Sequence, residues 1–157
     1  MNKIIPFLWF NGRAEEAMKF YTAVFPKSKP GKITRYKGVG PGPKGSVMSA
    51  TFQLRGQKFI ALNGGPQLKF SPAISFFVLC KTQREIDYFW KKLSAGGKKL
   101  NCGWLQDKFG VSWQVVPNVL WQLLHSPDAA KSNRVMEAMM RMNKLDIKKL
   151  KAAAVRG

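Results

Sequence analysis

The stretch "PFLWFNGRAEEAMKFYTAVFP", residues 6–26, joins an apolar run to a helical pattern, and the fold can be predicted outward from it. Residues 3–10 are mostly apolar and end at Asn11-Gly12, which is typical of a buried strand followed by a turn. Apolar side chains then recur at helical spacing over residues 13–25, and Pro26 ends that pattern. The stretch therefore predicts a strand followed by an amphipathic helix.

Three shorter segments after this stretch have the pattern of strands. Residues 46–54 alternate between two sets of side chains, as a strand with one buried face does. Residues 38–45 are rich in glycine and proline and predict a loop. The predicted strands are 33–36, 46–54 and 58–62. With the first strand and helix they make one βαβββ module.

The same order of elements returns in the second half of the chain. The two halves align with a constant offset of 69, and the matching pairs include Pro6/Ser75, Phe7/Phe76, Glu16/Glu85, Phe20/Phe89 and Tyr21/Trp90. Thr82 followed by Glu85 is the pattern of a capping box, which predicts a helix from there to about residue 93. The predicted strands of this half are 73–79, 100–105 and 111–116, with a hairpin turn at 107–110. Together with the repeat, they predict a second βαβββ module, of which these are three of the four strands.

The last forty residues have a helical pattern. A short helix is predicted over 119–124, a second from Ser126-Pro-Asp128, and a last one capped by Asp146. We therefore expect a single α+β domain over residues 1–157, in which paired βαβββ modules form a cleft. Its parts are module one (about 1–66), module two (about 70–117) and a C-terminal helical tail (118–157).

The composition is that of a globular chain with a large excess of positive charge. Hydrophobic residues make up 45% of the 157, and no apolar run reaches the roughly 18 residues that span a bilayer. With only two cysteines and no signal-peptide pattern, we expect a cytoplasmic protein without membrane insertion. The 27 Lys and Arg against 8 Asp and Glu give a formal charge of +19, which favours association with polyanions. Because the lysines are spread along the chain, binding to nucleic acid would be non-specific.

Five stretches, taken together in this order, carry a resemblance to a known family. They are "PFLWFNGRAEEAMKFYTAVFP" (6–26), "GQKFIALNGGP" (56–66), "SPAISFFVLCKTQREIDYFWKKLSAGG" (71–97), "CGWLQDKFGVSWQVVP" (102–117) and "RVMEAMMRMNKLDIKKLKAA" (134–153). The chain resembles the vicinal oxygen chelate superfamily (glyoxalase and bleomycin-resistance proteins), and within it the PhnB-like, 3-demethylubiquinone-9 3-methyltransferase-like group. The resemblance implies a glyoxalase-like fold and a homodimer with a small-molecule cleft.

The positions that hold a metal ion in this superfamily are poor in ligands here. The resemblance carries them over to Pro6 and Ser75 in the first strands, to Gln114 in the last strand of module two, and to Ile60, Ala61 or Asn63 in module one. Divalent cations are usually held by carboxylate, imidazole or thiolate groups, and none of these positions offers one. We therefore expect no metal site and no cofactor. The only histidine, His125, lies in the tail, so no catalytic residues can be assigned.

The cleft itself is the remaining candidate site. Several aromatic residues fall on predicted strands, and a few polar ones lie among them, which is the usual make-up of a small-molecule site. The candidates are Gln114, Ser75, Asn63, Trp9, Trp104 and Trp113. The sequence predicts that they bind a small apolar or aromatic molecule. Two alternatives stay open: an enzyme of the vicinal oxygen chelate or methyltransferase type with an unknown substrate, and an electrostatic binder of nucleic acid or another polyanion.

Overall fold

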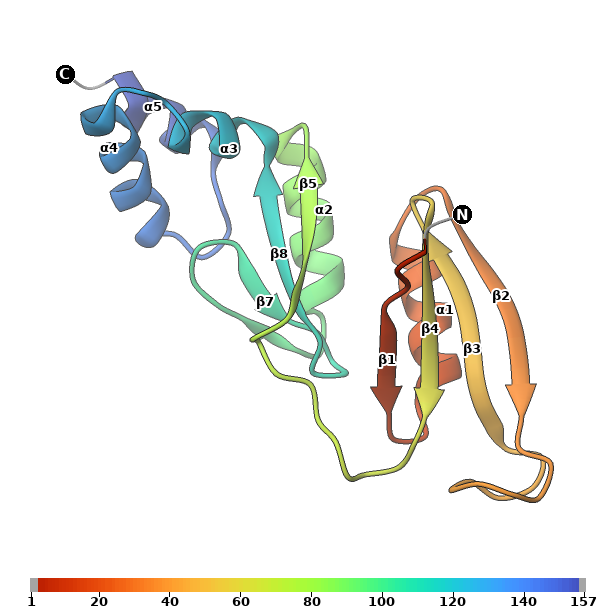
Figure 1. Ribbon diagram of the computed structural model, residues 1–157. Helices are drawn as coiled ribbons and strands as arrows, with labels where there is room; N and C mark the ends of the chain where they lie inside the picture. The colour runs from red at the N-terminus through yellow and green to blue at the C-terminus, as the bar shows by residue number, and fades with distance from the viewer. Residues whose placement is uncertain (1–2, 156–157) are drawn as a thin grey trace. The chain divides into compact units, whose positions relative to one another are not determined.

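The computed structural model describes residues 3–155, and the chain divides into two compact units, Met1–Phe70 and Ser71–Gly157, which are described separately (Figure 1). Each unit contains one four-stranded sheet and one helix that packs on it. We call the sheets sheet one and sheet two, and we call the face that its own helix leaves uncovered the open face of each sheet. None of the helices within residues 3–155 is long and apolar enough to cross a bilayer.

The first unit has the predicted βαβββ order. Its elements are β1 (Phe7–Phe10), α1 (Ala14–Val24), β2 (Ser28–Arg35), β3 (Val47–Leu54) and β4 (Gln57–Asn63). The strand order in sheet one is β1-β4-β3-β2, with β1 parallel to β4 and the other pairs antiparallel. Strand β2 is longer than the predicted 33–36, because its first residues pair with the end of β3 although Pro30 and Gly31 are poor strand formers.

The second unit repeats this arrangement and adds three helices. Its elements are β5 (Ser75–Cys80), α2 (Gln83–Ser94), β6 (Lys98–Lys99), β7 (Trp104–Gln106), β8 (Ser112–Pro117), α3 (Asn118–Leu124), α4 (Ala129–Met140) and α5 (Ile147–Val155). The order in sheet two is β5-β8-β7-β6, so the internal repeat and the α+β, glyoxalase-like fold class are confirmed. The single strand predicted over 100–105 is wrong: Leu100 to Gly103 form an irregular connection between β6 and β7.

The two halves match with different offsets in their helices and in their first strands. Helices α1 and α2 begin at positions 14 and 83, as the offset of 69 predicts. The last residues of β1 and β5 are both buried and stand at 10 and 80, so the strands are offset by 70. The loop before α2 is thus one residue shorter than the loop before α1. The predicted pairing of Pro6 with Ser75 is therefore one residue out of register, and Ser75 corresponds to position 5.

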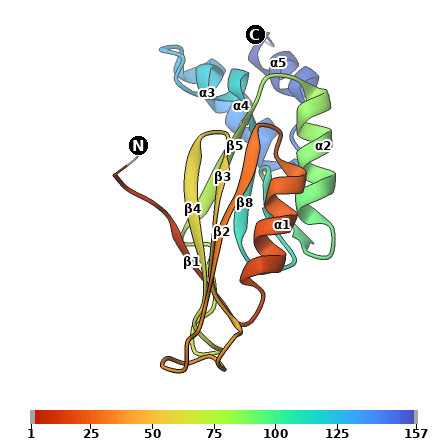
Figure 2. The ribbon, with the colours of Figure 1, turned by 90° about the vertical axis from the view of Figure 1, so that its right-hand side faces the viewer.

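Each sheet is buried on the face that its helix covers. In sheet one this face carries the apolar core of the first unit, which includes Leu8, Phe10, Ala50, Phe52, Phe59 and Ala61. Figure 2 shows α1 lying along one side of the strands of sheet one. Because successive strand residues point to opposite faces, Phe7 falls on the open face, where it is 57% exposed. Its counterpart on β5, Phe77, is also exposed, at 44%.

The three C-terminal helices form a second core at the end of sheet two. Its buried members are Val116, Leu120, Val135, Leu145, Leu150 and Ala154. The Gln83 side chain on α2 donates to the carbonyl of Leu145 at 3.0 Å and accepts from the amide of Ile147 at 2.9 Å. Backbone amides of the irregular connection donate to Met142 and Asn143, both at 2.8 Å. These bonds attach the tail to sheet two and its helix.

An ion pair between α2 and the segment before α5 adds a pH-dependent contribution. Lys144 lies 2.9 Å from the Asp87 carboxylate, and Gln83 donates to the same oxygen at 3.1 Å. The hydrogen bond from Lys144, together with the one from Gln83, lowers the pKa of Asp87 below its ordinary value. A lowered folded-state pKa adds stability above the unfolded pKa of about 3.9, and this stability is lost as the pH falls through the folded value.

We expect Asp87→Asn to destabilise the protein slightly at pH 7 and less at pH 2.5. Both side chains are about half exposed, so solvent screening limits the loss at pH 7 to about 0.5 kcal/mol or less. Urea unfolding of both proteins at the two pH values measures the difference. An equal loss at both values would contradict an origin in the carboxylate charge.

Candidate functional site

Three of the predicted site residues come together on the open face of sheet two. Gln114 is the register partner of Phe77 on β5 and of Trp104 on β7, so the three side chains form a row across adjacent strands. The Gln114 side-chain amide donates to the Ser75 hydroxyl at 3.0 Å. Gln114, Ser75 and Trp104 are all half-buried. The row therefore consists of one amide between two aromatic rings, with a hydroxyl beside it.

A second row of polar residues runs next to the first. Ser112 on β8 is the register partner of Ser75 and of Gln106, and it lies on the same face as Gln114. Its side chain is 1% exposed, and its hydroxyl oxygen has no hydrogen-bond partner among the described residues. A buried hydroxyl without a partner costs free energy, so such groups usually bind a water molecule or a ligand.

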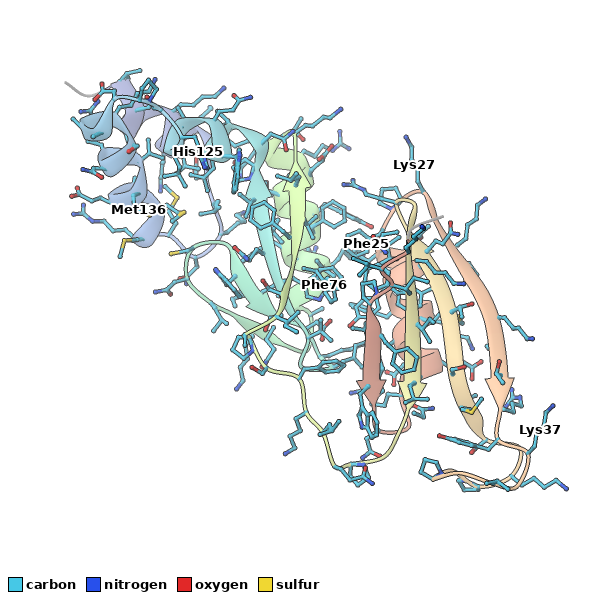
Figure 3. All side chains as sticks on the ribbon, in the orientation of Figure 1. Phe25, Lys27, Lys37, Phe76, His125 and Met136 are labelled. Carbon is cyan, nitrogen blue, oxygen red and sulfur yellow. The ribbon has the colours of Figure 1, made fainter. Side chains whose placement is uncertain are left out.

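The first of the C-terminal helices adds an aromatic side chain to this face. The Trp121 ring on α3 contacts the Phe77 ring edge to face, with 6.4 Å between their centroids. The His125 ring, labelled in Figure 3 near the end of α3, also packs against the Trp121 ring, with 4.4 Å between their centroids. No sequence pattern points to Trp121, because the periodicity of its helix predicts only a tail element and does not indicate that the helix folds back onto β5.

Trp113 lies on the opposite, helix-covered face of sheet two. It is 3% exposed, and its indole N–H donates to the buried Asp107 carboxylate at 2.9 Å. Its ring packs on Phe76, labelled in Figure 3, with 5.2 Å between centroids. Strand alternation explains this placement, since Trp113 directly precedes Gln114 and must point the other way. Trp113 therefore contributes to the core, and we do not include it in the proposed site.

Asn63 has a structural role at the start of α1. Its side-chain oxygen accepts a hydrogen bond from the Ala14 amide at 2.9 Å, and its side-chain nitrogen donates to the Val47 carbonyl at 3.1 Å. Helix α1 begins after Arg13, whose side chain makes no capping bond, so Asn63 supplies the cap from β4. Both ends of its amide are thus used within the fold, and we leave Asn63 out of the proposed site.

Trp9 lies on the open face of sheet one and is tied to the turn after β4. Its indole N–H donates to the Gly65 carbonyl at 2.9 Å. A Cβ atom on Gly64 would stand 2.4 Å from the Trp9 ring, so only glycine fits there. Gly64 is therefore explained by close packing against Trp9, and Gly65 by its positive φ of +108°. Trp9 belongs to the first unit, whereas the row around Gln114 belongs to the second.

The positions equivalent to the metal ligands of the superfamily offer few groups that bind metal ions. With the strand offset of 70, Ser75 corresponds to Ile5, and the pairing of Phe7 with Ile60 makes Ile60 the counterpart of Gln114. Two of the four positions are therefore isoleucine, and the other two are a neutral amide and a hydroxyl bonded to each other. This donor set does not suit a divalent cation. Within residues 3–155, no three His, Cys, Asp or Glu side chains lie close enough to hold a metal ion.

Comparison with known proteins gives matches to one family and to several solved structures. The family model for 3-demethylubiquinone-9 3-methyltransferase matches residues 2–116. The PhnB protein from Bacillus cereus, which carries the same description, is 43% identical; the match covers 74% of this chain and 99% of that chain, with a TM-score of 0.68. A search of curated proteins finds no significant match.

Two more distant structures share the fold alone. A protein from Pseudomonas aeruginosa is 21% identical, with 74% of this chain and 98% of that chain covered and a TM-score of 0.62. The fosfomycin resistance protein FosX from Listeria monocytogenes, solved with Mn(II) and sulfate, is 13% identical; 71% of this chain and 88% of that chain are covered, with a TM-score of 0.53. The family model ends at residue 116, so helices α3, α4 and α5 lie beyond it.

Proposed function

Because the chain belongs to the 3-demethylubiquinone-9 3-methyltransferase family, within the vicinal oxygen chelate superfamily, we propose that the open face of sheet two binds a small aromatic molecule. The family assignment and the glyoxalase-like fold confirm the resemblance that the sequence indicated. The observation that carries the proposal is the row Phe77–Gln114–Trp104 across three strands of sheet two. A flat ring can stack on the two aromatic side chains while its polar substituent bonds to the amide between them.

The polar groups beside the row define what such a ligand would present. The side-chain NH2 group of Gln114 donates to the Ser75 hydroxyl. The side-chain oxygen of Gln114 accepts no hydrogen bond from the described residues. This oxygen can accept a hydrogen bond from a hydroxyl or amine on the ring. The unpartnered hydroxyl of Ser112, two residues before Gln114 on β8 and on the same face, supports a second polar contact after a small movement of the side chains around it. We therefore propose an aromatic ligand with one or two hydrogen-bonding substituents.

We propose binding and not methyl transfer. The common type of S-adenosylmethionine enzyme uses a parallel sheet whose first strand leads through a glycine-rich turn into a helix. In this chain both sheets are mixed, and the Gly64-Gly65 pair packs against Trp9 without opening a helix. The row itself contains no carboxylate, imidazole or thiol that could act as a general acid or base.

We expect Gln114→Leu to bind 2-naphthol, a ring with one hydroxyl, about three- to tenfold more weakly than the unchanged protein. This lies within the range for losing one neutral hydrogen bond, about 0.5–1.5 kcal/mol, while the ring contacts remain. The titration is followed by two-dimensional 15N–1H NMR, in which amides of residues 75–79, 104–106 and 112–114 should shift.

The matched control is Gln122→Leu, the same change at an exposed position on α3, which should leave the affinity within twofold. Thermal unfolding of each variant shows that it is folded. The proposal fails if the shifted amides lie outside sheet two, or if both variants bind 2-naphthol as tightly as the unchanged protein.

A further inference from the structure

A separate hollow with a volume of about 350 Å³ lies in the first unit, where β2, β3 and β4 meet near the β3–β4 turn. Its wall includes Lys29 from β2, Gln53 from β3 and Lys58 from β4. Lys29 is the register partner of Gln53, and Gln53 is the register partner of Lys58. Directly paired residues on antiparallel strands point to the same face with Cβ atoms about 5 Å apart, so two ammonium groups flank one amide.

A bulge in β2 provides the recess beside this row. The pairing of β2 with β3 shifts between Pro30 and Ile33, and Gly31 there lies directly against Thr51. A Cβ atom on Gly31 would stand 2.3 Å from the Thr51 hydroxyl oxygen, which itself accepts a hydrogen bond from the Lys32 amide at 2.8 Å. Bulges of this kind occur often at sheet edges and next to binding sites, where they redirect side chains.

The charges of the hollow are all of one sign. No Asp or Glu lines it, and neither Lys29 nor Lys58 has an ion-pair partner among residues 3–155. Two cations close together repel each other, and an anion placed between them would relieve that repulsion. The Gln53 side chain, which is exposed between them, can add a hydrogen bond through its NH2 group.

We propose that this hollow binds an oxyanion with two negative charges, of which phosphate is the simplest. Two ammonium groups match its charge, and the amide between them matches one of its acceptor oxygens. The site lies on sheet one and does not depend on the aromatic site proposed for sheet two, so either proposal can fail without the other.

The experiment is an NMR titration of the full chain with sodium phosphate at constant ionic strength. We expect the amides of residues 29–32 and 51–58 to shift, and we expect K29Q/K58Q to weaken the apparent affinity at least about fivefold. The matched control K37Q/K44Q removes the same charge from the loop after β2. Figure 3 labels Lys37 in this loop, at the opposite end of β2 from Lys27. The apparent phosphate affinity of the control should stay within about twofold of that of the unchanged protein.

Three results would overturn the proposal. Equal weakening in both double variants would mean that phosphate responds only to the net charge of +19. Shifts confined to other parts of the chain would place the anion elsewhere. Acetate binding as tightly as phosphate would contradict the preference for a doubly charged group. Because Lys29 is exposed and Lys58 half-buried, K29Q/K58Q should fold, and the thermal unfolding midpoint checks this.

Discussion

Leu145→Ala is expected to destabilise the second unit by about 3 kcal/mol. Leu145 is fully buried and packs in the C-terminal core with Val116 at the end of β8. Gly103 packs against its side chain so closely that a Cβ atom there would stand 3.0 Å from Leu145 Cδ1. Truncating a buried leucine removes apolar contacts and leaves a cavity, which costs about 2–5 kcal/mol.

Urea unfolding followed by tryptophan fluorescence measures the loss, since four of the five tryptophans belong to the second unit. Leu68→Ala is the matched control, because Leu68 is 58% exposed in the first unit and should cost less than about 0.5 kcal/mol. A loss below about 1 kcal/mol for Leu145→Ala would show that α3, α4 and α5 are not held to sheet two by this core.

Asp107→Asn is expected to cost about 2–4 kcal/mol, because one carboxylate organises the whole β7–β8 hairpin. One of its oxygens accepts from the amides of Phe109 and Val111, at 2.8 and 3.0 Å, and the other accepts from the Trp113 indole at 2.9 Å. Asp107 is only 3% exposed. An asparagine keeps one acceptor oxygen and turns an NH2 group toward a donor, so at least one buried N–H loses its partner.

The control for this change is Asp128→Asn. Asp128 caps α4 by accepting from the Lys131 amide at 3.2 Å, and asparagine is an equally good capping residue, so stability should hardly change. Guanidinium unfolding compares the two variants. A loss below about 1 kcal/mol for Asp107→Asn would mean that the hairpin does not depend on the carboxylate.

The helix caps that could be predicted from sequence are those supplied by the residue directly before the helix. Thr82 accepts from the Glu85 amide at 3.2 Å, as the capping-box pattern predicted, although the Glu85 carboxylate accepts from the Lys81 amide and not from that of Thr82. Asp146 likewise accepts from the Lys149 amide at 3.1 Å. Helix α1 has no such residue, and its cap, Asn63, comes from a strand 49 positions later, which no local pattern can reveal.

The candidate site likewise combines a residue that the sequence indicated with contacts that only the tertiary structure decided. The polar character of Gln114 in an apolar strand was visible in the sequence, and its bond to Ser75 gives it a partner within the fold. The choice between Gln114 and its neighbour Trp113 depended on which side of sheet two α2 covers. The contact of Trp121 with Phe77 depended on where α3 folds back, and the row of Lys29, Gln53 and Lys58 depended on strand register.

The sequence by itself determined the order of the elements except for β6, the internal repeat, the family and the local caps, because each follows from patterns within a few residues or from similarity along the chain. Only the tertiary structure decided which strand residues meet across each sheet and which face their helix covers. A shift of one residue, such as the change from an offset of 69 to 70 between the first strands, moves every side chain to the other face. Sequence similarity between the halves hardly changes with that shift, whereas the packing of each sheet against its helix allows only one of the two registers.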